Sequence, residues 1–103
     1  MNPGRKSKPG KTRPVVVIQS SDVTESGAPS IVIVPLTSQT REENILRLRI
    51  NKRDLPSLEQ ESDILIDQIH TVDRSLFLKE LGTIPQSLMK KIMEGVQFVL
   101  GEV

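Results

Sequence analysis

Residues 15–20 read VVVIQS and residues 31–36 read IVIVPL, and these two runs decide the fold. Valine and isoleucine are stiff at their first side-chain torsion and favour a pleated sheet, so each run predicts a strand. Neither run alternates with polar residues, which is typical of strands covered on both faces. Pro35 cannot donate to a sheet ladder and predicts an edge or a bulge near the end of the second strand. The polar, turn-rich residues 20–30 predict a connecting loop.

Three segments further along the chain complete the predicted sheet. Residues 45–50, ILRLRI, alternate, with apolar side chains on one face and Arg47 and Arg49 on the other, which predicts a half-exposed strand. Residues 63–69, DILIDQI, predict another strand, and residues 75–83 predict a short one. About five short strands of this kind indicate an antiparallel barrel or a curled sheet.

After Pro85 the apolar residues change to a helical period. They recur on one side of the segment at Leu88, Ile92, Val96 and Val99. Pro85 suits a first helical turn and Gly101 suits a helix stop, so we predict a helix over residues 85–100. The predicted fold class is therefore mainly β with a C-terminal helix packed on the sheet.

The chain has 103 residues and no cysteine, which fits one domain without disulfides or thiolate metal ligands. We divide the domain into a basic loop at residues 1–13, the strands and loops of a barrel at 14–84, and the helix at 85–100. No apolar run approaches the roughly 20 residues that span a bilayer. The first residues also lack the apolar stretch of a signal peptide, so we expect a cytoplasmic protein without membrane contact.

Positive charge is gathered at the N-terminus. The whole chain has 14 Lys and Arg against 13 Asp and Glu, a net charge of +1. Residues 1–13 hold no acid and five of the basic residues, Arg5, Lys6, Lys8, Lys11 and Arg13. A cationic arm attracts phosphate whatever the nucleotide sequence. Because Phe77 and Phe98 are the only aromatic residues, contact with RNA must rely on charge and hydrogen bonds rather than on base stacking.

The sequence contains no motif that is typical of a metal site or of an activated nucleophile. There is one histidine, His70, with no cysteine and no Gly-rich phosphate loop of the required spacing. No Gly-x-Ser-x-Gly elbow presents a serine to His70, which argues against a Ser-His-Asp triad and favours a solvated side chain. We expect neither a metal nor a cofactor.

Three polar positions remain as candidates for binding or catalysis. Arg13 lies directly before the first strand, where the following proline restricts its backbone. Thr37 follows the second strand, and Asp67 and Gln68 interrupt the apolar run of the fourth. Each also has a structural interpretation: Arg13 can pair with a surface carboxylate, Thr37 can cap a turn, and Asp67 can accept backbone N–H groups.

Three segments together resemble a known family. They are TRPVVVIQSSD at 12–22, IVIVPLTSQ at 31–39 and LIDQIHTVDRSLFLKELGTI at 65–84. In this order and spacing they resemble the MazF/PemK (Kid) family of toxin endoribonucleases over most of residues 2–100. The resemblance implies an SH3-like β-barrel with a C-terminal helix, a homodimer, and cleavage of single-stranded mRNA without a metal, which stops translation and growth. It also implies neutralisation by a MazE-like antitoxin whose acidic, extended tail occupies the RNA groove.

The resemblance also assigns roles to individual residues. The arginine of the family's Arg-Pro motif is Arg13, the hydroxyl of its Pro-x-Thr motif is Thr37, and the aspartate that some members are thought to use as a base is Asp67. Substrate contacts are expected from Lys8, Lys11, Thr12, Ser38, Gln39 and Gln68. The chemistry suits these groups, because a guanidinium opposes charge that develops on phosphate, a hydroxyl donates to a non-bridging oxygen, and a carboxylate accepts a proton.

Three departures from the family pattern bear on activity. Some relatives carry an arginine two residues before the aspartate, and Leu65 stands there, so that acid–base pair cannot operate unchanged. The family's first strand does not precede Asn2-Pro3, which predicts an unpaired strand edge. Lys8 replaces a family acid in the loop before the Arg-Pro motif and strengthens the attraction to phosphate.

Two other functions stay open on the sequence. The departures allow a catalytically degraded relative that binds antitoxin or RNA without cleaving. A gyrase poison of the CcdB kind shares the barrel, but the action of that class depends on a C-terminal tryptophan, and this chain ends Leu100-Gly101-Glu102-Val103.

Overall fold

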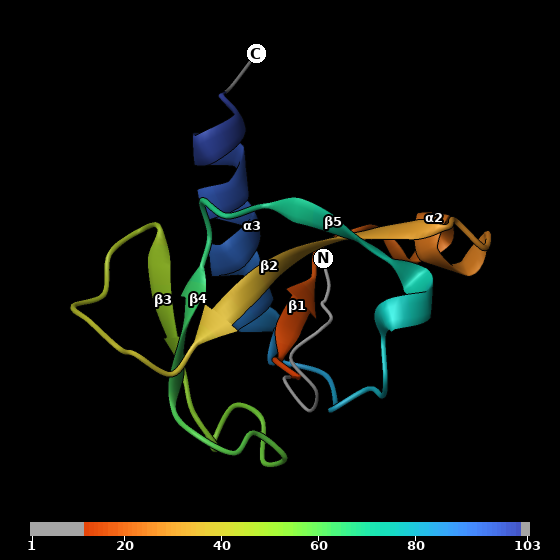
Figure 1. Ribbon diagram of the computed structural model, residues 1–103. Helices are drawn as coiled ribbons and strands as arrows, with labels where there is room; N and C mark the ends of the chain where they lie inside the picture. The colour runs from red at the N-terminus through yellow and green to blue at the C-terminus, as the bar shows by residue number, and fades with distance from the viewer. Residues whose placement is uncertain (1–11, 102–103) are drawn as a thin grey trace.

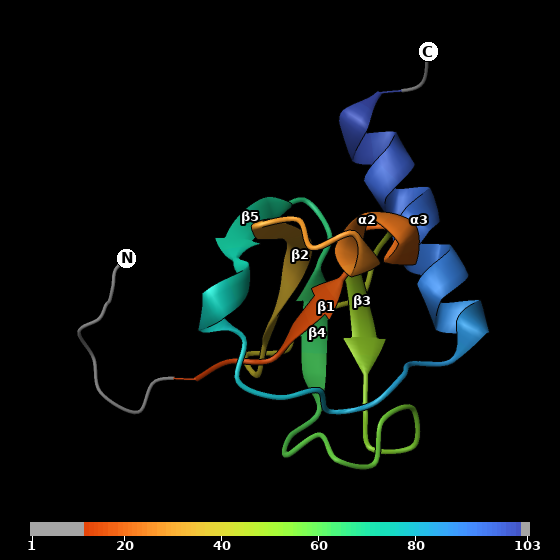
Figure 2. The ribbon, with the colours of Figure 1, turned by 90° about the vertical axis from the view of Figure 1, so that its right-hand side faces the viewer.

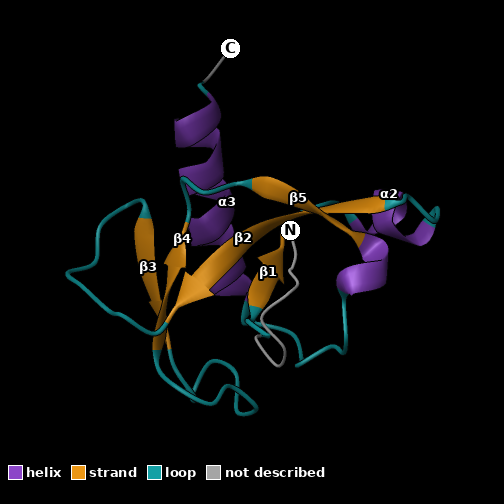
Figure 3. Ribbon diagram, viewed as in Figure 1, coloured by secondary structure: helices purple, strands orange, loops and turns teal. Residues whose placement is uncertain are grey.

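The computed structural model describes residues 12–101, and its elements are drawn in Figures 1 and 3. In chain order they are β1 (Val15–Val17), α2 (Ser21–Glu25), β2 (Ser30–Thr37), β3 (Arg47–Ile50), β4 (Ser62–Leu65), β5 (His70–Asp73), the 3-10 helix η1 (Arg74–Leu76) and α3 (Gln86–Leu100). The predicted class, mainly β with a C-terminal helix, is confirmed. None of the helices in this part of the chain is long and apolar enough to cross a membrane.

Strand β2 is the centre of the sheet. The antiparallel order is β1-β2-β4-β3, and β5 pairs with β2 as well. β5 lies against residues 30–33 of β2, whereas β4 lies against Leu36 and Thr37 at its end, as Figure 1 shows. Pro35 pairs with Val15 of β1 but falls between the pairings of β2 with β5 and with β4. The expected irregularity at Pro35 is therefore a change of partner strand.

Helix α3 covers one face of the sheet, as Figure 2 shows. Its residues Ile92 and Val96 are 0% and 5% exposed, and each such burial contributes roughly 1.5–3 kcal/mol. The core cluster consists of Val16, Val34, Leu36, Ile50, Leu55, Leu58, Ile64, Ile66, Ile92 and Val96. Gly101 ends the helix at φ 83°, and its N–H donates to the carbonyl of Gln97. The helix predicted over residues 85–100 is confirmed to within one residue.

Gly95 marks the closest approach of α3 to the sheet. A Cβ there would lie 2.9 Å from the carbonyl oxygen of Ile45 and 2.9 Å from Cγ2 of Ile66. Alanine favours a helix over glycine by about 1 kcal/mol, but forcing a methyl group against fixed backbone costs about 1–3 kcal/mol. We expect Gly95→Ala to lower the free energy of unfolding by about 1 kcal/mol in urea denaturation. The exposed helix variant Gln97→Ala serves as control, and a Gly95→Ala protein as stable as the parent would contradict the close approach.

Two predictions for the N-terminal half of the fold were wrong. Strand β1 is not covered on both faces, because it lies at the edge of the sheet and buries only Val16. The segment 20–30 is not all loop, since α2 forms within it. The side chain of Ser20 accepts from the N–H of Val23 and caps this helix, which is too short for an apolar period to reveal it.

No strand forms in the segment 75–83. The chain turns instead into η1, whose cap Asp73 accepts hydrogen bonds from the N–H and the hydroxyl of Ser75. The sheet still has five strands, because β5 takes the place of the strand predicted there. The two hydrogen bonds from Ser75 hold the pKa of Asp73 below its ordinary value.

Candidate active site

Arg13 lies two residues before β1, and Thr37 is the last residue of the adjacent strand β2. Val15 pairs with Pro35, and the ladder continues to a hydrogen bond of 3.4 Å from the N–H of Leu36 to the carbonyl of Pro14. The next position along the same antiparallel register is Arg13 opposite Thr37. Directly opposed residues of an antiparallel pair point to the same face, with Cβ atoms about 5 Å apart. The register therefore supports the pairing of these two residues that the sequence motifs predict.

The hydroxyl of Thr37 is oriented by the turn that follows β2. Its Oγ1 accepts a hydrogen bond of 3.2 Å from the N–H of Gln39. Thr37 thus caps a turn, as its structural interpretation expected, but the hydrogen of its hydroxyl remains for donation to another acceptor. Thr37 is half-buried, while Ser38 and Gln39 are exposed at the strand end, where a ligand can reach them.

A buried aspartate lies beside Thr37 on the next strand. Thr37 pairs with Asp63 of β4, and Asp63 pairs in turn with Arg49 of β3. These three residues form a row across three strands. Asp63 is 0% exposed. Sequence reasoning did not select it as a site residue.

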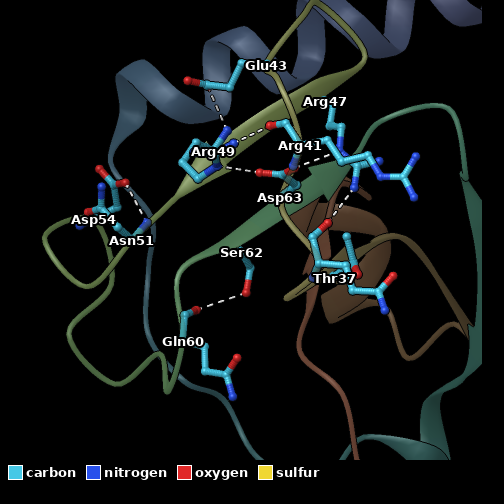
Figure 4. Close-up of polar contacts among 11 residues, drawn as sticks. Thr37, Arg41, Glu43, Arg47, Arg49, Asn51, Asp54, Gln60, Ser62 and Asp63 are labelled. Carbon is cyan, nitrogen blue, oxygen red and sulfur yellow. Dashed lines mark hydrogen bonds and ion pairs between the residues drawn. The ribbon is translucent and has the colours of Figure 1, made fainter.

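Two arginines and a backbone amide surround the carboxylate of Asp63 (Figure 4). Nε of Arg47 lies 2.7 Å from Oδ2, and Nε of Arg49 lies 2.5 Å from Oδ1. The N–H of Arg41 donates to Oδ2 at 2.8 Å. Each guanidinium also reaches the loop after β2, since Nη2 of Arg47 donates to the carbonyl of Gln39 at 2.7 Å and Nη2 of Arg49 donates to the carbonyl of Arg41. We call Asp63, Arg47 and Arg49 the Asp63 cluster.

The Asp63 cluster keeps its carboxylate ionised. Burial by itself raises the pKa of Asp63, but the hydrogen bonds from Arg49, the Arg41 amide and Arg47 outweigh it and bring the pKa below the ordinary value. Because both oxygens already accept hydrogen bonds and the pKa is low, Asp63 is unsuited to take a proton from a substrate.

A weak signal for this cluster was present in the sequence. Arg47 and Arg49 alternate with apolar residues on one strand, and Asp63 begins the apolar run of another. Nothing local, however, indicates that these strands pair with Arg49 opposite Asp63. The contact joins residues 14 to 16 positions apart, beyond the reach of a periodicity argument.

Asp67 and Gln68 do not lie within a strand, which corrects the prediction for residues 63–69. β4 ends at Leu65, and both residues are exposed in the turn that leads to β5. The solvated interpretation of His70 fits the structure, where the exposed ring contacts the carbonyl of Gln68 at 2.9 Å. The role of Asp67 as a base stays a prediction.

The basic arm is described only at its end. Thr12 and Arg13 are exposed ahead of β1. Lys8 and Lys11, which are predicted to contact substrate, lie outside the described residues. Within residues 12–101, no group of three or more His, Asp or Glu side chains is placed to hold a metal ion.

Residues 1–100 match the family of PemK-like, MazF-like toxins of type II toxin-antitoxin systems. The chain belongs to this family. A probable endoribonuclease MazF of Mycolicibacterium smegmatis is 30% identical to it over 92 residues, which are 89% of this chain and 83% of the relative. The resemblance on which the residue assignments rest is thereby confirmed at the level of the family.

Solved structures share the MazF-like fold. A mycobacterial endoribonuclease in complex with its cognate antitoxin superposes with a TM-score of 0.74 at 20% identity, over 94% of this chain and 88% of that one. The MazE–MazF complex of Deinococcus radiodurans gives a TM-score of 0.73 at 16% identity, over 88% of this chain and 83% of that one. At such low identity these similarities establish the fold of the chain.

Proposed function

We propose that this MazF-like protein is an endoribonuclease that cleaves single-stranded RNA through the 2′-hydroxyl, with Arg13 and Thr37 as catalytic residues. In the cell it would act as the growth-inhibiting toxin of a toxin-antitoxin pair. The observation that supports the proposal is the β1–β2 register, which would put Arg13 opposite Thr37 if it continued two positions past Val15 and Pro35. A phosphate between these two side chains would meet a guanidinium and a hydroxyl donor together.

The reaction transfers two protons and exchanges one bond at phosphorus. The 2′-oxygen loses its proton and forms a bond to the adjacent phosphorus, and the bond from phosphorus to the 5′-oxygen breaks. The 5′-oxygen takes up a proton from water as it leaves, so the products are a 2′,3′-cyclic phosphate and a 5′-hydroxyl. Negative charge gathers on the non-bridging oxygens in the transition state. Arg13 would oppose that charge, and the hydroxyl of Thr37 would donate to one of those oxygens.

The proton acceptor in this proposal is Asp67, which the family resemblance assigns. Its carboxylate is exposed and therefore open to substrate, unlike the carboxylate of Asp63. The arm residues Lys8 and Lys11 would hold neighbouring phosphates, and the polar residues Thr12, Ser38, Gln39 and Gln68 would contact the nucleotides.

The partners in the proposal are a MazE-like antitoxin and a second copy of the chain. Solved relatives are complexes with an antitoxin, which supports the first partner. Near the end of α3, Phe98 and Leu100 are 65% and 70% exposed. Large apolar side chains in such a position offer a surface for the second copy.

The test is cleavage of a short single-stranded RNA by the purified protein in the presence of EDTA, with the fragment ends analysed by mass spectrometry. We expect cyclic phosphate and 5′-hydroxyl ends. The same oligonucleotide with one 2′-deoxy residue at the cut position should stay intact at that linkage, because the nucleophile is missing. RNA that is bound but not cut would support the degraded relative, and fragments from the 2′-deoxy substrate would exclude this mechanism.

A further inference from the structure

The Asp63 cluster does more than neutralise a buried charge, because it fixes the path of the loop after β2. Three hydrogen bonds join the cluster to that loop: to the carbonyl of Gln39, to the carbonyl of Arg41 and from the N–H of Arg41. A guanidinium is planar, so its Nε and Nη2 atoms stand in a fixed relation. The carbonyls of Gln39 and Arg41 are thereby held at set positions relative to the Asp63 carboxylate.

Gln39 connects this cluster to the hydroxyl of Thr37. Its carbonyl accepts from Arg47 at 2.7 Å, and its N–H donates to Oγ1 of Thr37 at 3.2 Å. The loop residue that the cluster holds is therefore the same residue that orients the hydroxyl. Thr37 is also the direct cross-strand partner of Asp63, so the two ends of this connection lie on one face of the sheet.

We propose that Asp63 is a positioning residue for RNA cleavage, acting through Arg47 and Gln39 to hold the Thr37 hydroxyl toward the scissile phosphate. The inference rests on the proposed function and adds a residue that the family motifs do not mark. Stability alone is a weak reason for such a cluster, since a buried ion pair gains little over apolar residues of the same volume. What the cluster supplies specifically is the position of the loop.

The two arginines make different contacts, which provides a matched pair of variants. Arg47 donates to the carbonyl of Gln39, the residue whose N–H contacts the Thr37 hydroxyl. Arg49 donates instead to the carbonyl of Arg41, further along the loop. Lysine at either position keeps the positive charge but has a single ammonium that cannot reproduce the two-pronged contact. Arg47→Lys should therefore disturb the hydroxyl more than Arg49→Lys does.

The experiment measures kcat and KM on a short RNA for Asp63→Asn, Arg47→Lys and Arg49→Lys, below the unfolding temperature of each variant. We expect Asp63→Asn and Arg47→Lys to lower kcat by about 10-fold or more with KM changed about twofold at most, because misplacing a catalytic group slows chemistry more than binding. Arg49→Lys should lower kcat less.

A double-mutant cycle with Thr37→Ala separates positioning from general destabilisation. If Asp63 acts through the hydroxyl, Asp63→Asn should change kcat little once that hydroxyl is gone. Full additivity of the two effects, or an Asp63→Asn enzyme with the parent's kcat, would overturn the inference. If Asp63→Asn does not fold, the same double-mutant cycle is measured with Arg47→Lys and Thr37→Ala.

Amide hydrogen exchange of Gln39 and Arg41 provides a readout that does not depend on activity. Loss of the cluster should speed exchange at both amides by about 10-fold or more in Asp63→Asn, because their hydrogen bonds open. A parent chain that does not cleave RNA would overturn the proposed function. In that event faster exchange would still support the loop-holding role of the cluster, and unchanged exchange would overturn it.

Discussion

Arg13→Ala should reduce the rate of RNA cleavage by about 10²- to 10³-fold, because it removes a cationic donor aimed at charge that exists only in the transition state. Arg13 is exposed just before β1, so replacing its side chain leaves no cavity and should not change the free energy of unfolding measurably. The effect should fall on kcat and on kcat/KM alike, as expected for an interaction made in the transition state. Single-turnover cleavage of a fluorescent RNA measures it.

Two variants control this prediction. Lys90→Ala removes the same charge from the exposed side of α3 and should retain the parent's rate. Arg13→Lys keeps the charge but loses the fork geometry, so its rate should lie between those of the parent and the alanine variant. If Arg13→Ala cleaves RNA at a rate within about twofold of the parent's rate, Arg13 is not a catalytic residue.

Asp63→Ala should lower the free energy of unfolding by about 3 kcal/mol at neutral pH, because it leaves an orphaned Arg41 amide and two guanidinium groups without their counter-ion. The arginine side chains are 21% and 26% exposed, so water recovers part of their solvation and the loss stays at the lower end for a broken buried pair. Urea denaturation measures the difference. A variant as stable as the parent would mean that the ion pairs contribute nothing net.

The stability lost in Asp63→Ala should depend on pH. The folded-state pKa of Asp63 lies below the ordinary value of 3.8, so the unfolded chain binds the proton more readily. The stabilisation that the Asp63 carboxylate provides is therefore fully present at pH values above 3.8. It is lost as the pH falls through the lower pKa of Asp63 in the folded state. The stability difference between the parent and Asp63→Ala should stay constant from pH 7 to about 5 and shrink below about 4. A difference that grows on acidification would contradict the sign of the shift.

The elements that the sequence predicts well are those with a strong local period. Ile92 and Val96 recur at helical spacing between Pro85 and Gly101, and α3 forms there. The β-branched run IVIVPL likewise becomes β2. In both segments the apolar pattern and the intrinsic propensity agree, and agreement of this kind makes an element predictable.

The predictions that failed depend on contacts between distant segments. The run DILIDQI is apolar enough for one long strand, but pairing with β2 and β3 uses only residues 62–65, and the chain turns at Asp67. In the sequence alone, Asp63 is only the start of a strand; its ion pairs with Arg47 and Arg49 depend on the pairing of β3 with β4. The assignment of Arg13 and Thr37 comes from the Arg-Pro and Pro-x-Thr motifs and stays a prediction, because the β1–β2 register ends at Val15 and Pro35.

The most direct test of the central claim is a crystal structure of the protein with an RNA that carries a 2′-deoxy residue at the cut position. The account predicts one phosphate group between the two strand ends. One of its non-bridging oxygens should lie within about 3.2 Å of the Arg13 guanidinium, and another within about 3 Å of Oγ1 of Thr37. A scissile phosphate bound elsewhere, or Arg13 and Thr37 on two different phosphates, would contradict it.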